Sequence, residues 1–191
     1  MQMGVRKNIL WITRTAVLTA LLVAAQFLTA PLGNQYVTGS AVNLLLIVSF
    51  LTCGLATGLT VAIVSPVCAF LAGVGFSFPP LIPFVALGNA ALVMAWFFWG
   101  VLMKSAAPGM RHKTMYYLLA AAAAVMKFLT LYAGIVLFAI PYLLDLNEKQ
   151  RVMLTLSFSY PQIITAAIGG IIALAVMPPL QKALRSFGRG V

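Results

Sequence analysis

Residues 115–140 read MYYLLAAAAAVMKFLTLYAGIVLFAI, and only one of these side chains, that of Lys127, carries a charge. A helix needs about 20 apolar residues to cross a bilayer, and this stretch is longer than that. The whole chain has the same character, because 63% of its 191 residues are hydrophobic and 7% are charged. A soluble domain carries about 25% charged residues, so the composition excludes a soluble enzyme and indicates an integral membrane protein.

Hydropathy divides the chain into six apolar segments within a single transmembrane domain, residues 1–191. The region 41–72 is too long for one unbroken span, and Gly54 and Gly58 offer a turn that divides it into two shorter helices. The sequence therefore predicts an all-α, polytopic bundle of six transmembrane helices. The predicted spans cover residues 9–30, 41–53, 58–72, 81–103, 115–140 and 157–178.

The basic residues predict the orientation of these spans. Nine of the twelve Lys and Arg residues lie on one side of a six-span arrangement, whereas the opposite side holds Lys149 and Arg151 beside the two acids, Asp145 and Glu148. The positive-inside rule then predicts that both termini are cytoplasmic. The nine residues are Arg6, Lys7, Arg14, Lys104, Arg111, Lys113, Lys182, Arg185 and Arg189.

Few residues are available for covalent chemistry. The one histidine, His112, lies between two basic residues, and both acids lie outside the spans. Cys53 and Cys68 lie in apolar runs and are interpreted as buried small hydrophobes rather than a metal pair or a disulfide. We therefore expect no enzymatic activity, no cofactor and no metal site, and the absence of a continuous basic face argues against a nucleic-acid partner.

Lys127 is the one charged residue deep inside a predicted span, where a lysine costs about 2.5–3.5 kcal/mol on insertion scales. One interpretation is a cationic anchor for an anionic group of a small-molecule substrate. The other is a structural lysine, hydrogen-bonded by carbonyl groups and amide side chains. Asn43, Asn89 and Gln162 also lie in or beside the spans and either share a substrate pocket with Lys127 or form interhelical hydrogen bonds.

Two predicted outer loops have compositions suited to covering a pocket. Residues 31–40 are uncharged and rich in turn-forming residues, and residues 73–83 combine glycines, aromatic residues and prolines. The loops act either as lids, with Tyr36, Phe76 and Phe78 as apolar cover, or as short connectors in the membrane interface.

The first span carries a stripe of small residues, Ala16, Ala20 and Ala24, at four-residue spacing. Small residues on one face allow another helix to approach closely, so the stripe is a candidate docking face.

Taken together, these features resemble the S component of an energy-coupling factor (ECF) transporter. The likeness in architecture covers the whole chain, and a more specific likeness covers roughly residues 34–96, including residues 35–43 and the segment from Ser65-Pro66 to Asn89. The resemblance implies a prokaryotic plasma-membrane protein that binds a vitamin or related micronutrient. It further implies that the alanine stripe docks on a transmembrane T subunit driven by two ATPase subunits, and that residues 31–40 and 73–83 close the substrate site.

Two other functions stay open: a structural or assembly subunit without its own ligand, and a self-sufficient facilitator. A transport subunit should hold Lys127 or Asn89 in a closed polar pocket, whereas an assembly subunit should be packed solid there. A facilitator should show polar residues that continue to the cytoplasmic face.

Overall fold

The computed structural model describes residues 2–75, 78–105 and 113–187, and these residues are nearly all helical, with no strand among them. Among the described residues, five helical segments are long and apolar enough to cross a membrane, and α3 is a shorter apolar helix. The prediction of an all-helical membrane bundle is confirmed at this level. The elements are α1 (Gln2–Thr29), η1 (Ala30–Leu32), α2 (Gln35–Cys53), α3 (Leu55–Leu71), η2 (Pro79–Leu81), α4 (Ile82–Ser105), α5 (Lys113–Leu131), η4 (Tyr132–Ala139), α6 (Ile140–Tyr142), α7 (Glu148–Ser157) and α8 (Pro161–Phe187).

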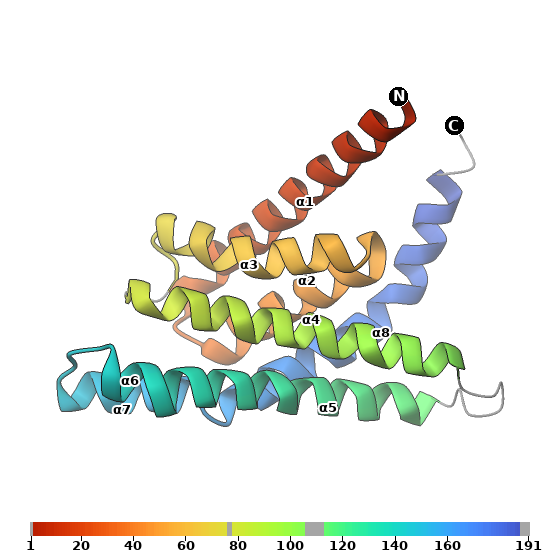
Figure 1. Cartoon of the computed structure of the whole chain (residues 1–191). Helices are drawn as coiled ribbons and strands as arrows, with labels where there is room; N and C mark the ends of the chain where they lie inside the picture. The colour runs from red at the N-terminus through yellow and green to blue at the C-terminus, as the bar shows by residue number, and fades with distance from the viewer. Residues whose placement is uncertain (1, 76–77, 106–112, 188–191) are drawn as a thin grey trace.

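The helices form a bundle in which α2 packs against α1, α3 and α8, and α4 packs between α3 and α5. The first turns of α1 and the last turns of α8 lie at the same end of the bundle, which we call the terminal end (Figure 1). The opposite end carries η1, η2 and α6, and we call it the loop end. Helix α8 contains Pro178 and Pro179, and its last part turns away from the rest of the bundle (Figure 1).

Helix α2 begins six residues earlier than the sequence predicted. The side chain of Asn34 accepts a hydrogen bond from the backbone N–H of Tyr36 at 2.9 Å and caps the helix, after a left-handed turn at Gly33 (φ 61°). The prediction of a loop over residues 31–40 is therefore wrong from Gln35 onward. Only a short connection remains between the first two long helices.

The break between α2 and α3 lies at Gly54, whose φ of 87° favours glycine, and involves no other residue. Gly58 lies inside α3 instead of in the turn. A Cβ added to it would lie 2.9 Å from Phe50 Cβ and 3.1 Å from Val93 Cγ1, so this glycine allows α3 to approach α2 and α4. Helix α3 consequently begins at Leu55, three residues before the predicted span.

The fifth predicted span is helical throughout, and the sixth begins later than predicted. The fifth is one continuous helical length in which η4 is a π-helix, a variant with wider hydrogen-bonding turns. The predicted sixth span, 157–178, corresponds to α8, which begins four residues later, at Pro161, because residues 158–160 separate it from α7. Helix α7 begins with a capping box, because Asn147 accepts from the backbone of Gln150 while Gln150 accepts from that of Asn147.

The buried apolar side chains form two clusters. The first unites side chains of α1, α2, α3, α4, α5 and α8, and includes Leu22, Leu46, Trp96 and Ala123. The second lies toward the loop end, between η2, η4, α6 and α7, and includes Leu131 and Phe158. On α5, Lys127 lies between Ala124 of the first cluster and Leu131 of the second.

Candidate functional site

The amino group of Lys127 is buried in the bundle and hydrogen-bonds to two other helices. Its Nζ donates to Oδ1 of Asn43 at 2.6 Å and to Oδ1 of Asn89 at 2.8 Å. The three side chains are 4%, 1% and 3% exposed. These hydrogen bonds therefore connect α5 to α2 and α4 at one point in the interior.

A fourth helix joins this network through Thr165. The amide nitrogen of Asn43 donates to Oγ1 of Thr165 at 3.3 Å, and Thr165 in turn donates to the carbonyl oxygen of Gln162 at 3.2 Å. We call Asn43, Asn89, Lys127 and Thr165 the lysine cluster. It lies about two helical turns from the loop-end starts of α2 and α4, a depth of roughly 12 Å.

No acid compensates the charge of the lysine cluster. The chain has only two acids, and both are exposed: Asp145 lies between α6 and α7, and Glu148 is the first residue of α7. Amide oxygens satisfy hydrogen bonds of the ammonium but carry no net charge. The lysine cluster therefore holds one buried positive charge without a carboxylate to pair with it. Burying such a charge costs free energy, so helix packing alone does not explain the lysine.

Toward the terminal end, the neighbours of the lysine cluster are apolar, and those on α5 are small. Ala120, Ala123 and Ala124 lie on the α5 turns that precede Lys127, and all three are buried in the first apolar cluster. Leu92 and Trp96 continue the same face of α4 beyond Asn89. The polar cluster is thus bounded on this side by a packed apolar core.

Glycines bring the surrounding helices close together. A Cβ added to Gly39 of α2 would lie 2.9 Å from Thr165 Cγ2, and one added to Gly169 of α8 would lie 2.7 Å from Asn43 Cβ. On the other side, a Cβ at Gly88 of α4 would lie 2.5 Å from Leu131 Cδ2. The α2–α8 and α4–α5 interfaces therefore both close tightly beside the lysine cluster.

Gln162 and Tyr36 lie outside the lysine cluster, at the loop end. The side-chain amides of Gln162 and Gln35 both donate to the carbonyl oxygen of Ser157, at 3.0 and 2.6 Å. Tyr36 hydrogen-bonds to Tyr160, and both side chains are exposed. We call these five residues the loop-end clamp, because they join the start of α2 to the junction of α7 and α8.

The third aromatic candidate, Phe76, lies outside the described residues. Phe78 follows it and packs, partly buried, against the second apolar cluster beside η2. Thr165 was missed by the sequence analysis. Thr165 follows Gln162 by three residues and therefore lies on the same face of the helix. This spacing was the feature of the sequence that could have identified it.

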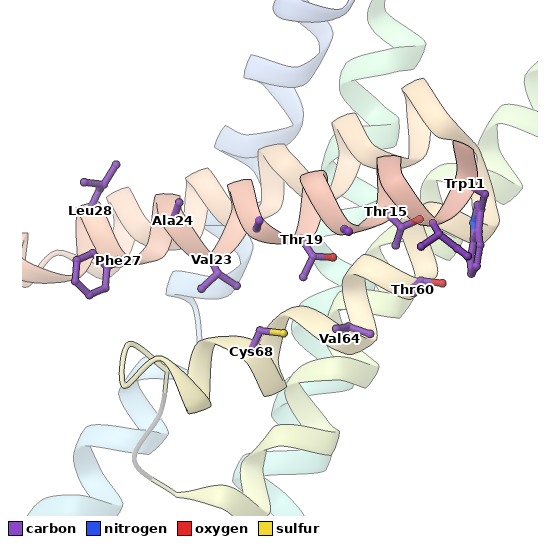
Figure 2. A pocket seen from close by; sticks show the side chains of 13 residues that line it. Trp11, Thr15, Thr19, Val23, Ala24, Phe27, Leu28, Thr60, Val64 and Cys68 are labelled. Carbon is purple, nitrogen blue, oxygen red and sulfur yellow. The ribbon is translucent and has the colours of Figure 1, made fainter. Parts of the chain in front are cut away.

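The alanine stripe of α1 faces a groove between α1 and α3, with a volume of about 940 Å³ (Figure 2). Ala16, Ala20 and Ala24 are all exposed and line the groove. Side chains of α3, among them Val64 and Cys68, form the opposite wall (Figure 2). The groove is almost entirely apolar and follows the apolar span of α1, Asn8–Leu32.

Comparisons of the chain with protein-family models, with curated proteins and with solved structures find no match.

Proposed function

We propose that this protein is the high-affinity substrate-binding subunit, or S component, of an ATP-driven ECF-type uptake transporter for a vitamin or related small micronutrient. In this proposal six helices cross a prokaryotic plasma membrane and both termini are cytoplasmic. The groove along α1 carries the proposal, because the described residues leave its alanines exposed on an apolar surface.

The proposed occupant of the groove is an apolar helix of the transmembrane T subunit, which couples the S component to two ATPase subunits. The groove lies within the apolar span of α1, so a water-soluble partner would not reach it. Alanines at four-residue spacing let a second helix backbone approach closely and gain van der Waals contact. Thr15 and Thr19 also line the groove but are buried, so the exposed alanines stay accessible to a second helix.

The lysine cluster is the proposed centre of the substrate site. It is separated from the groove, which contains none of its residues, so substrate binding and docking use different surfaces. The loop-end clamp, together with residues 31–34, 73–75 and 78–83, is proposed to cover the site from outside. The apolar core on the terminal side of Lys127 argues against a self-sufficient facilitator, which needs a polar path through the membrane.

The orientation is tested by labelling single cysteines in intact cells, in a background with Cys53→Ala and Cys68→Ala. We expect Glu148→Cys to react with a membrane-impermeant maleimide added outside, because this exposed residue begins α7. Lys182→Cys, near the end of α8, should react only after the membrane is permeabilised. Reaction of both cysteines, or of Lys182→Cys alone, in intact cells would contradict the proposed orientation.

Docking is tested by Ala20→Trp, which fills the groove with a large ring and is expected to prevent copurification with the T and ATPase subunits. Leu21→Trp is the matched control, because Leu21 is exposed on the same turn of α1 but does not line the groove. We expect the control to copurify normally. If both variants assemble like the natural protein, the groove is not the docking face.

An assembly subunit without a ligand is the second candidate. The observation in its favour is that Lys127 already has two hydrogen-bond acceptors inside a tightly packed bundle. Such a protein would bring helices of a complex together, and its lysine would only connect α2, α4 and α5. The two functions differ in whether the purified protein retains a small molecule.

A further inference from the structure

We infer that the substrate carries a single carboxylate group and that the lysine cluster is where this group binds. The inference rests on the proposed function and specifies the chemistry of its ligand. It is drawn from the charge, the unused hydrogen-bond donors and the surroundings of Lys127.

The charge of the cluster calls for an anion. Lys127 is 4% exposed, and its two acceptors are neutral amide oxygens. A buried cation is stabilised most when a carboxylate replaces the lost water, and the two acids of the chain lie far along the sequence in an exposed segment. A ligand carboxylate would supply the counter-charge that the chain does not.

The lysine cluster also has hydrogen-bond donors that lack acceptors among the described residues. A protonated lysine has three N–H groups, and only two of them have acceptors among the described residues. The amide nitrogen of Asn89 has no acceptor among those residues either, whereas that of Asn43 is used by Thr165. Lys127 and Asn89 can therefore each donate to one oxygen of the same carboxylate.

A third polar group lies one turn away on α2. The hydroxyl of Ser40 is buried and makes no hydrogen bond to the described residues, although a helical serine ordinarily donates to a preceding carbonyl. Ser40 precedes Asn43 by three residues and so lies on the same face, toward the loop end. A ligand that reaches Lys127 from the loop end would pass this hydroxyl.

One carboxylate fits the cluster better than a doubly charged group. Lys127 is the only cation in the described interior, because the other described basic residues, Arg14, Lys149, Arg151 and Lys182, are exposed. A dianionic phosphate would leave one buried negative charge uncompensated. Leu131 and the aromatic Phe84 lie toward the loop end, so the rest of the ligand is expected to be uncharged and largely apolar.

The experiment identifies the small molecules released when the purified protein is denatured, by mass spectrometry before and after methyl esterification. We expect one compound that gains a single methyl group, released from the natural protein and from Lys182→Met. Lys182→Met is the matched control, because it makes the same change at an exposed position. The compound should be absent from Lys127→Met.

Asn89→Asp separates ligand binding from folding. An aspartate there would place a carboxylate beside Lys127 and take over the charge pairing, so the variant should fold and yet release no compound. The isolated compound and its methyl ester are then added back to the natural protein, and the ester should bind at least 30-fold more weakly, as expected for a lost buried charge pair.

The outcomes distinguish the two proposals. A released compound without an acidic group or with two of them, or one that Lys127→Met or Asn89→Asp retains, overturns the carboxylate inference and leaves the proposed function standing. Equal binding of the acid and its methyl ester also overturns the carboxylate inference and leaves the proposed function standing. If the natural protein releases no compound, both the inference and the proposed function fail.

Discussion

Replacing Gly169 with alanine is expected to lower the free energy of unfolding by about 2 kcal/mol, because the added methyl group has no room. A Cβ at this position would lie 2.7 Å from Asn43 Cβ, 2.8 Å from the backbone nitrogen of Leu44 and 3.0 Å from the carbonyl oxygen of Ser40. Two of these atoms belong to the backbone, so relief requires α2 and α8 to separate. That separation would also weaken the hydrogen bond between Asn43 and Thr165.

Gly100→Ala is the matched control for this prediction. Gly100 lies inside α4, and a Cβ added to it meets nothing within 4 Å. Alanine in a helix is favoured over glycine by about 0.5–1 kcal/mol, so this variant should be slightly more stable than the natural protein. Both are measured by circular dichroism during unfolding in mixed micelles of increasing SDS content. Equal effects of the two substitutions would show that the α2–α8 contact is looser than the structure indicates.

The helical class and most span positions follow from the sequence because the membrane imposes them. Long apolar runs with so few charges have few alternatives, since backbone polar groups in lipid must be satisfied within the segment. The interruption near residue 54 was also predictable, because a glycine with positive φ ends a helix at little cost. Hydropathy identifies segments whose side chains avoid water, and this is the property that defines the long spans.

The boundaries were less predictable because local hydrogen bonds decide them. The side chain of Asn34 starts α2 at Gln35, within a segment whose composition is typical of a turn. Asn147 and Gln150 start α7 in the same way, although the helix is too polar to be detected as a span. The π-helical segment η4 has no evident signal in the sequence.

The candidate site was predictable as a set of residue types but not as a geometry. A lysine in an apolar span needs polar partners, and Asn43, Asn89 and Gln162 were the candidate amides. Hydropathy does not give the rotation of each helix, so it could not distinguish Asn43 and Asn89 from Gln162. The structure brings Asn43 and Asn89 to Lys127 and leaves the side chain of Gln162 on Ser157 at the loop end.

Asn89→Leu is expected to destabilise the protein by about 3 kcal/mol, because it removes one of the two acceptors of Lys127 and leaves a buried cation underpaired. Lys127→Met removes the charge together with both hydrogen bonds and keeps the length of the side chain. It is expected to cost less, about 1 kcal/mol, since the two amides left behind are neutral.

The double variant Asn89→Leu with Lys127→Met measures how much the interaction between these two residues contributes to the free energy of unfolding. Once the lysine is gone, leucine at position 89 faces no buried charge, so the double variant should be more stable than Asn89→Leu alone by about 2 kcal/mol. Independent residues would instead give additive losses within about 0.5 kcal/mol. Neutral interhelical hydrogen bonds in membranes couple by about 0.6 kcal/mol on average, so a coupling near the expected value of about 3 kcal/mol would identify Lys127 as charged in the folded protein. Additive losses would mean that Lys127 is stabilised without Asn89, and the lysine cluster would then be an arrangement of neighbours and not a binding centre.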